Sequence, residues 1–197
     1  MTTPTRNRAN RRTEILDAAA SLFAARGFHG VSIEDIGAAV GVTGPALYRH
    51  FPSKEAILAE TLLAISSHLR DTAAEVVTRG ADPAATLEAL LDLHVSFALD
   101  NPALITVHDR ELGNVPEPQR RRIRRLQRLY VEEWVTVLAE LAPRCPSARL
   151  RAATHAVFGL LNSTPHSGGE LPPEAMRELL RSMARAALES VVNASSL

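Results

Sequence analysis

Residues 32–54 read SIEDIGAAVGVTGPALYRHFPSK, and this stretch decides the fold of the chain. Ser32 and Asp35 have the spacing of a capping box, the pair of reciprocal hydrogen bonds with which many helices begin. Apolar residues then recur at helical spacing as far as Val40, which predicts a short helix with one buried face. Gly41 follows, and a glycine readily adopts the positive φ of a sharp turn after a helix.

A second short helix is predicted directly after this turn. Thr43 is placed to cap it, and Pro45 fits near its first position, where a backbone N–H would have no partner. Leu47 and Phe51 are expected to point back at the first helix, and the polar surface holds Tyr48, Arg49 and His50. Two short helices around a glycine turn are typical of the helix-turn-helix, whose second helix enters the major groove of DNA.

The same stretch carries a family resemblance. Residues 41–58 read GVTGPALYRHFPSKEAIL, and residues 13–40 before them read TEILDAAASLFAARGFHGVSIEDIGAAV. Together they resemble the DNA-binding domain of the TetR family of one-component transcriptional regulators. The resemblance implies an N-terminal three-helix DNA-binding domain, followed by a C-terminal helical domain for ligand binding and dimerisation.

The resemblance also implies which residues face DNA. Phosphate contacts are expected from Thr43, Tyr48, His50 and Lys54. The forked donors of Arg49 suit a guanine edge, and Pro45 and Ala46 suit a thymine methyl group. Gly44 departs from the family, because many relatives have a longer polar residue there. The full set predicted to bind DNA is Arg12, Thr13, Ser32, Thr43, Gly44, Pro45, Ala46, Tyr48, Arg49, His50 and Lys54.

The charge distribution agrees with an end of the chain that faces phosphates. The 197 residues have a formal net charge of zero. Residues 1–54 carry seven basic and four acidic groups, whereas residues 55–197 carry 15 basic and 18 acidic groups. Such asymmetry favours a basic nucleic-acid-binding region joined to a more acidic body.

Other features of the sequence argue against several classes of protein. The single cysteine, Cys145, excludes an internal disulfide and indicates a reducing, cytoplasmic compartment. Apolar runs stay well short of the roughly 20 residues that a membrane helix needs, and no signal peptide is recognisable. No nucleophile–base pair, metal-ligand spacing or cofactor motif stands out, so we expect neither an enzyme nor a metal or cofactor.

The chain reads as all-α, with about nine helices. Residues 1–12 are polar and unpatterned and predict a disordered arm. For Arg6 and Arg8 two interpretations are equally open: they belong to a solvated tail, or they contact DNA. Residues 13–54 form the predicted DNA-binding domain and residues 55–197 the ligand-binding and dimerisation domain. The predicted helices cover about 12–26, 33–40, 43–51, 53–79, 83–100, 103–112, 117–141, 147–163 and 173–192.

The last two predicted helices have apolar faces too wide for one layer to cover. By resemblance to TetR regulators, they are expected to pair with their symmetry mates in a four-helix dimer interface. The residues predicted there are Leu150, Ala153, Val157, Leu161, Met176, Leu180, Met183 and Ala187.

A ligand pocket is expected among the middle helices. Its predicted lining is Leu62, Leu91, His94, Val95, Ile105, His108, Trp134, Phe158 and Asn162. Residues 160–167, LLNSTPHS, resemble TetR members that sense acyl-CoA or other lipid-metabolism intermediates, although Asn162 and His166 could equally satisfy the end of a helix. Six arginines between Arg120 and Arg128 are either a solvated face or a site for an anionic headgroup, such as coenzyme A phosphates.

The sequence therefore predicts a homodimeric repressor that binds a palindromic operator in double-stranded DNA. A small apolar or amphipathic effector, such as an acyl-CoA or a fatty acid, is expected to release it. The long helix at 53–79 is either the mechanical link in this switch or a plain core helix. A ligand-independent DNA-binding protein is the alternative, and an enzyme of lipid or drug metabolism is the distant third.

Overall fold

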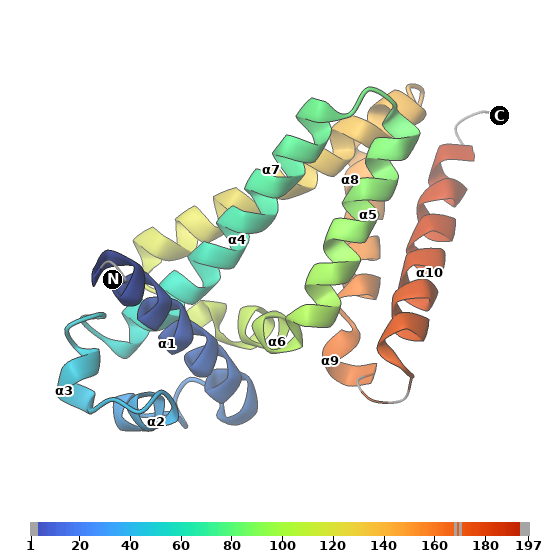
Figure 1. Ribbon diagram of the computed structural model, residues 1–197. Helices are drawn as coiled ribbons and strands as arrows, with labels where there is room; N and C mark the ends of the chain where they lie inside the picture. Colours follow the sequence, from blue (N-terminus) through green and yellow to red (C-terminus); the bar gives the residue numbers. More distant parts are fainter. Residues whose placement is uncertain (1–3, 168, 170, 194–197) are drawn as a thin grey trace. The chain divides into compact units, whose positions relative to one another are not determined.

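The structure is a computed structural model that describes residues 4–167, 169 and 171–193, with side chains from residue 10 onward. Its elements are α1 (Pro4–Arg26), α2 (Ile33–Ala39), α3 (Gly44–Leu47), α4 (Lys54–Arg79), α5 (Pro83–Asp100), α6 (Pro102–Glu111), the 3-10 turn η1 (Leu112–Asn114), α7 (Glu117–Leu141), α8 (Ser147–Leu161), α9 (Thr164–Ser167) and α10 (Pro173–Asn193). Over the described residues there is no strand, which confirms the all-α class (Figure 1).

All nine predicted helices have a counterpart, and two short elements add to them. The helix predicted for residues 43–51 is shorter than expected: α3 ends at Leu47, and residues 48–50 form a turn. The expected sixth helix ends one residue early and continues as η1, and the single turn α9 lies in the expected loop after α8. Nothing in the described helices combines the length and apolar composition that a bilayer crossing demands.

The predicted disordered arm is wrong for residues 4–12, because α1 begins at Pro4. Low hydrophobicity suggested disorder, but alanine and arginine are good helix formers and a proline is tolerated in the first turn. No breaker separates this segment from the rest of α1, so the helix extends backward from the packed part. Residues 1–3 and the side chains of Arg6 and Arg8 lie outside the described part of the chain.

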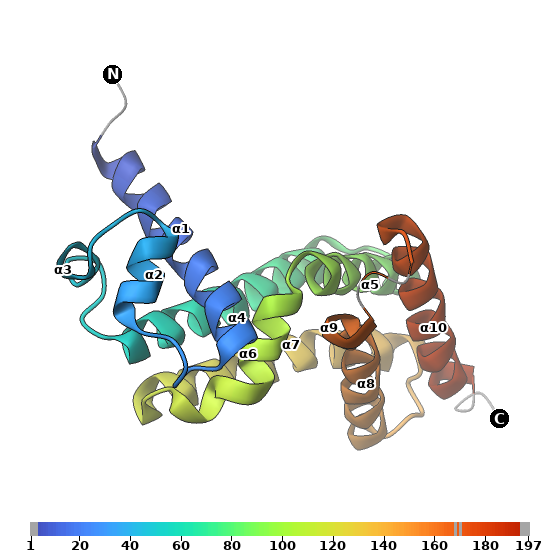
Figure 2. The ribbon, with the colours of Figure 1, turned by 90° about the horizontal axis from the view of Figure 1, so that it is seen from below.

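The chain divides into two compact units. The first comprises residues 1–65 and 103–123, in which α2 packs against both α1 and α3 (Figure 2). Its core joins residues from all of its helices: Ile15, Ala19, Phe23, Phe28, Val31, Ile33, Ile36, Leu47, Phe51, Ile57, Leu58, Ala59, Leu62, Val107, Val115 and Ile123. The core holds the short helices α2 and α3, which are too short to be stable by themselves.

The second unit comprises residues 66–102 and 124–197. Within it α10 packs against α8 and α5, as Figure 1 shows. Trp134 is fully buried at the centre of its core, together with Leu90, Leu91 and Leu150.

This division differs from the predicted boundary after residue 54. Val107 and Val115, from α6 and the segment after η1, are buried in the core that contains Ile57 and Leu62 of α4. The early turns of α4 therefore belong with the helix-turn-helix unit, and α6 joins them through contacts distant in sequence. Both α4 and α7 have residues in each unit.

Candidate nucleic-acid interface and effector site

The predicted capping box at the start of α2 is present. The Asp35 amide donates to Ser32 Oγ at 3.0 Å, and the Ser32 amide donates to Asp35 Oδ2 at 2.8 Å. The hydrogen bonds from the Ser32 hydroxyl and amide, with Arg26 nearby, lower the pKa of Asp35. The carboxylate is thus ionised at neutral pH and fixes the entry into α2.

The turn after α2 depends on two glycines. Gly41 has a φ of +68°, the left-handed region that the sequence predicted for it. A Cβ on Gly37 would lie only 2.7 Å from the Val42 carbonyl oxygen, so the turn passes directly against the helix. Larger residues at these positions would move α3 relative to α2.

The single turn of α3 and the residues after it are held by buried side chains and expose polar ones. Leu47 and Phe51 are completely buried, whereas the side chain of Tyr48 is 53% exposed and Arg49 is exposed beside it. Thr43 caps the helix through its backbone, and its hydroxyl makes no capping hydrogen bond. Thr43, Tyr48 and Arg49 therefore present polar groups to solvent on a rigid base.

Lys54 has a structural role that the sequence did not predict. Its ammonium donates to the carbonyls of Phe28 at 2.8 Å and Val31 at 2.7 Å, and it lies 4.3 Å from the centre of the Phe28 ring. It thereby fastens the loop before α2 to the start of α4. An ammonium has three N–H groups, so one donor remains for the predicted phosphate contact.

Arg12, predicted as a phosphate contact, has several partners within the chain. Its guanidinium forms a two-pronged ion pair with Glu60, donates to the His50 carbonyl at 2.6 Å and lies 4.2 Å over the Phe51 ring. These contacts tie α1 to α4 and to the end of the recognition helix. Glu60, absent from the prediction, is the partner of Arg12, and the phosphate contact of Arg12 stays a prediction.

A groove beside the recognition helix brings several predicted residues together. Its lining is Ser32, Ile33, Glu34, Tyr48, Pro52, Ser53, Lys54 and Glu55. The N-terminus of α4 faces this groove, with Ser53 Oγ accepting from the Ala56 amide at 3.2 Å. Glu34 and Glu55 offset the charge of Lys54, so the least compensated positive charge next to α3 is Arg49.

The other predicted DNA residues are divided between surface and interior. Thr13, Ser32 and Pro45 are exposed, and Ala46 and His50 are half-buried. Gly44 is buried, and its predicted contact with DNA stays a prediction. A Cβ there would lie 3.2 Å from Glu34 Oε1, so a side chain at this position meets α2 before it meets DNA.

The second unit contains a buried polar network centred on His94. Its Nε2 donates to Asn162 Oδ1 at 3.1 Å, and its Nδ1 accepts from the Tyr130 hydroxyl at 2.9 Å. Burial lowers the pKa of His94 to about 4, and burial raises the pKa of Tyr130. Both groups are therefore neutral at physiological pH, and the network links α5, α7 and the end of α8 without a charge.

Aromatic rings enclose this network. The Phe158 ring stacks on His94 with centroids 4.4 Å apart, and Trp134 meets Phe158 edge-on at 5.1 Å. The predicted lining residues His94, Trp134, Phe158 and Asn162 thus lie together, joined by Tyr130, which the predicted lining does not include. Its position one helical turn before Trp134 was the available signal.

The remaining predicted lining residues are buried in separate cores or lie near the surface. Leu91 and Val95 are buried in the second unit. Leu62 and Ile105 are buried in the first unit, where His108 is half-buried and contacts Asp109. That Leu62, Ile105 and His108 line the same pocket as His94 stays a prediction.

Most of the predicted dimer residues face inward. Leu150, Val157, Leu161, Met176 and Leu180 are buried in the core of the second unit, because α8 and α10 pack on each other and on α5. Of the predicted set, Ala153 is half-buried, and Met183 and Ala187 are exposed on α10. Leu179, also 44% exposed, extends the apolar surface of that helix.

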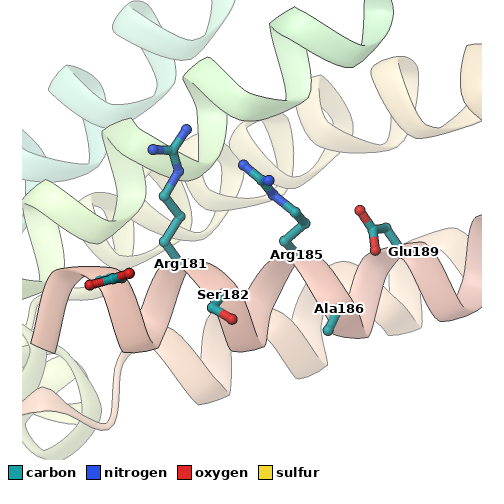
Figure 3. Close-up of a pocket in the computed structure, with 6 residues that line it drawn as sticks. Arg181, Ser182, Arg185, Ala186 and Glu189 are labelled. Atoms are coloured by element: carbon teal, nitrogen blue, oxygen red, sulfur yellow. The ribbon is translucent and has the colours of Figure 1, made fainter. Parts of the chain in front are cut away.

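Ion pairs hold α10 against α5. Arg181 reaches Glu88 and Asp92, and Arg185 also pairs with Glu88. Figure 3 shows Arg181 and Arg185 extending to the same side of α10, with Ser182 and Ala186 pointing away from them. The shallow groove lined by these residues consequently contains arginines whose charges are already compensated.

The arginine run on α7 is mostly solvent-facing. Arg120 and Arg121 pair with Glu117, and Arg122, Arg124, Arg125 and Arg128 are exposed.

In the part of the chain that the structure describes, no group of three or more His, Cys, Asp or Glu side chains could hold a metal ion.

Comparison with known proteins identifies relatives over both halves of the chain. Residues 15–61 match the family described as bacterial regulatory proteins, tetR family, and residues 80–189 match the tetracyclin repressor-like C-terminal domain. The HTH-type transcriptional repressor KstR2 of Rhodococcus jostii (strain RHA1) is 34% identical over 135 residues, which cover 68% of this chain and 66% of the repressor. The match thus spans slightly less than two thirds of that relative.

Solved structures show the same fold. A TetR-family transcriptional regulator from Bordetella parapertussis 12822 superposes with a TM-score of 0.77 and 25% identity, over 88% of this chain and 93% of that one. AibR, solved in complex with isovaleryl coenzyme A and operator DNA, superposes with a TM-score of 0.68 and 22% identity, over 88% and 97% of the two chains.

Proposed function

Because the chain belongs to the TetR family of bacterial regulatory proteins, we propose that it is a homodimeric repressor released from its operator by a small effector. The observation that carries this proposal is the exposed pair Tyr48 and Arg49 in the turn directly after α3, next to the buried Leu47 and Phe51. A rigid helix with polar groups outward is what major-groove recognition requires. Its site of action is the cytoplasm, where bacterial DNA lies.

The residues of α3 and those on either side of it have different tasks in this proposal. Arg49 reads a guanine edge, because its guanidinium can donate twice to one base and makes no ion pair within the described residues. Tyr48, Thr43 and the remaining N–H of Lys54 bind phosphates, which sets the register without reading sequence. Pro45 and Ala46 offer apolar contact to a thymine methyl group.

Rigidity of the helix-turn-helix is part of the proposed function. The Arg12–Glu60 pair and the Lys54 clamp hold α3 and the loop before α2 in place before DNA arrives. Such preorganisation lowers the conformational entropy lost on binding. Arg12 and Glu60 therefore affect affinity without touching the duplex, and Lys54 does so in addition to its phosphate contact.

The dimer is proposed to form through the outer faces of α8 and α10. Small and apolar residues are exposed there: Ala152, Ala156 and Gly159 on α8, and Leu179, Met183 and Ala187 on α10. Glycine and alanine permit close approach of helices, and the larger side chains supply buried apolar area. Two copies then place their recognition helices in successive major grooves about 34 Å apart.

The effector is proposed to bind in the second unit, at the network of His94, Tyr130 and Asn162. AibR, a structural neighbour, was solved with an acyl-CoA and its operator, which supports an amphipathic effector. The continuous helix α4 carries the change, since its residues belong to both units. With a typical coupling of about 1–3 kcal/mol, the effector lowers DNA affinity roughly 5- to 150-fold.

Selection of bound sequences from random duplex DNA tests the proposal directly. We expect a near-palindromic site whose two halves are one helical turn apart, bound by the wild type. Arg49→Ala should relax base preference at one position in each half-site. Arg144→Ala removes an equally exposed arginine of the second unit and should leave binding unchanged. Absence of any duplex binding at low ionic strength would refute the proposal.

Fatty acids and fatty acyl-CoAs can then be tested for release of the selected operator. Release measured by fluorescence anisotropy, together with a raised melting temperature, supports this class of effector. If no member of either class changes the melting temperature or the anisotropy, the effector belongs to another class.

A further inference from the structure

Six arginines lie on α7 between Arg120 and Arg128, and the proposed function uses none of them. They are six of the 15 basic groups in residues 55–197, a region that also has 18 acidic groups. The helix has no acidic residue between Glu117 and Glu132. The basic charge of an otherwise acidic body is therefore concentrated on about two and a half turns of one helix.

The acidic residues at either end of this run are already engaged. Glu117 pairs with Arg120 and Arg121. Glu132 accepts hydrogen bonds from Arg151 Nε at 2.7 Å and Nη2 at 3.0 Å, and these bonds lower the pKa of Glu132. Both carboxylates are therefore compensated by arginines other than those in the middle of the run.

Arg124, Arg125 and Arg128, here called the basic stripe, form an exposed group in the second unit. None of the three makes an ion pair within the described residues. Arg128 follows Arg124 by four residues and Arg125 by three, so their side chains are neighbours on the helix surface. Like charges at these spacings repel one another and destabilise a helix. An anionic partner would remove this repulsion.

The chemistry of the basic stripe favours phosphate groups. Each guanidinium presents a planar fork of donors that fits two phosphate oxygens at once. The three side chains are exposed, whereas a small ligand is normally bound in a concave pocket. An extended row of phosphates therefore suits the stripe better than a single small anion.

Duplex DNA fits the basic stripe better than a phospholipid surface. A helix that lies on a membrane inserts an apolar face among the headgroups. The apolar face of α7 is used inside the protein, where Tyr130, Val131 and Trp134 are buried in the core of the second unit. Of the large apolar side chains in the described part of α7, only Leu129 is exposed, at 39%. Contact with DNA phosphates needs no apolar insertion.

We propose that the basic stripe is a second DNA-binding surface, which contacts the phosphate backbone of duplex DNA without reading its base sequence. This inference rests on the DNA-binding function proposed above, because that function keeps the chain close to duplex DNA. The stripe adds phosphate contacts to those made around α3. Such contacts raise the affinity for any duplex and make that affinity more sensitive to salt.

Two triple variants with the same change in charge test the proposal. The first removes the basic stripe: Arg124→Gln, Arg125→Gln and Arg128→Gln. The control removes three arginines that are also exposed, make no ion pair within the described residues and lie in different parts of the chain: Arg110→Gln, Arg144→Gln and Arg149→Gln. Glutamine is a good helix former, and circular dichroism melting verifies that both variants are folded.

The measurement is binding of a long duplex that lacks the operator, followed by fluorescence anisotropy at increasing salt concentration. Each lost phosphate contact reduces the slope of the logarithm of the binding constant against the logarithm of the salt concentration by about 0.9. Loss of the stripe should therefore reduce this slope by roughly 2–3, and the control variant should keep the slope of the wild type. Equal slopes for all three proteins, or an equal reduction in both variants, would overturn the proposal.

Vesicles of phosphatidylcholine and phosphatidylglycerol test the other source of phosphates. If the stripe variant loses binding to these vesicles but keeps the wild-type slope on DNA, the partner is a lipid surface and the proposal is wrong.

Reading of the operator by α3 is measured separately, through the change in base preference that Arg49→Ala causes. If this preference is unchanged but loss of the stripe still reduces the slope, the proposed repressor function fails and the second surface stands. If Arg49→Ala changes the preference and loss of the stripe leaves the slope unchanged, the second surface alone is overturned.

Discussion

Replacing Arg12 with Met tests whether this residue positions the recognition helix or contacts DNA. The ion pair with Glu60 is partly exposed, with side-chain exposures of 40% and 36%. Screening by water limits such a pair to about 0.2–1 kcal/mol. The hydrogen bond to the His50 carbonyl adds about 0.5–1.5 kcal/mol, and the contact with the Phe51 ring about 0.5–1 kcal/mol. Since these terms overlap, we expect the free energy of unfolding to fall by about 1–3 kcal/mol.

The assay for DNA binding is the salt dependence of operator affinity. A positioning residue lowers affinity without changing the number of neutralised phosphates. In a plot of the logarithm of the binding constant against the logarithm of the salt concentration, Arg12→Met should therefore have the same slope as the wild type. Its binding constant should be several-fold lower at every salt concentration. A phosphate contact would instead reduce its slope by about 0.9. A reduced slope would refute the positioning role.

Glu60→Gln provides the matched control. If Arg12 acts through Glu60, this variant should also weaken operator binding, and the double variant should lose less than the sum of the two singles. If Arg12 binds phosphate, removal of the carboxylate should instead leave binding unchanged or strengthen it.

Three further predictions concern stability and assembly. Leu47→Ala, at a completely buried position, should lower the free energy of unfolding by about 2–5 kcal/mol in urea titrations. The pKa of His94 is lowered from 6.5 to about 4, so the unfolded chain binds more protons between these values and stability should fall as the pH drops through this window. The free energy of unfolding should fall by up to about 3 kcal/mol over this window. Urea unfolding at pH 7 and pH 5 should show a smaller difference in that free energy for His94→Phe than for the wild type. Met183→Glu places a charge on the proposed dimer face, so this variant should be more monomeric than the wild type in light scattering. Equal masses for the two proteins would contradict the proposed dimer face.

The helices were predictable because their signals are local. The capping box of Ser32 and Asp35, the glycine at 41 and the apolar periodicity each depend on residues within a turn or two of one another. The start of α1 was missed because composition alone does not separate a solvated helix from a disordered arm. A segment of arginine, asparagine and alanine forms a helix when it continues one already fixed by packing.

The candidate sites were only partly predictable, because partners distant in sequence decide what a side chain is free to do. Arg12 and Lys54 have the residue type and position of phosphate contacts, yet Glu60 and the carbonyls of Phe28 and Val31 occupy most of their donors. Gly44 reads as part of the recognition surface, but α2 lies against it. The local sequence does not show that these donors are already bound within the chain or that Gly44 is covered by another helix.

The same limit applies to the helices of the second unit. Periodicity showed that α8 and α10 have broad apolar faces, but it did not show which residues this chain buries itself. Leu150, Leu161 and Leu180 went to the internal core, which leaves Leu179 and Met183 outside.

The sequence by itself determined the helices, the turn between α2 and α3 and the family, because capping, glycine conformation and apolar spacing act over a few residues. Only the tertiary structure decided which donors are already satisfied, which apolar faces remain open, and that His94 joins Tyr130 to Asn162. Hydrogen bonds and burial join residues far apart in the chain, so their outcome depends on packing in three dimensions and not on local pattern.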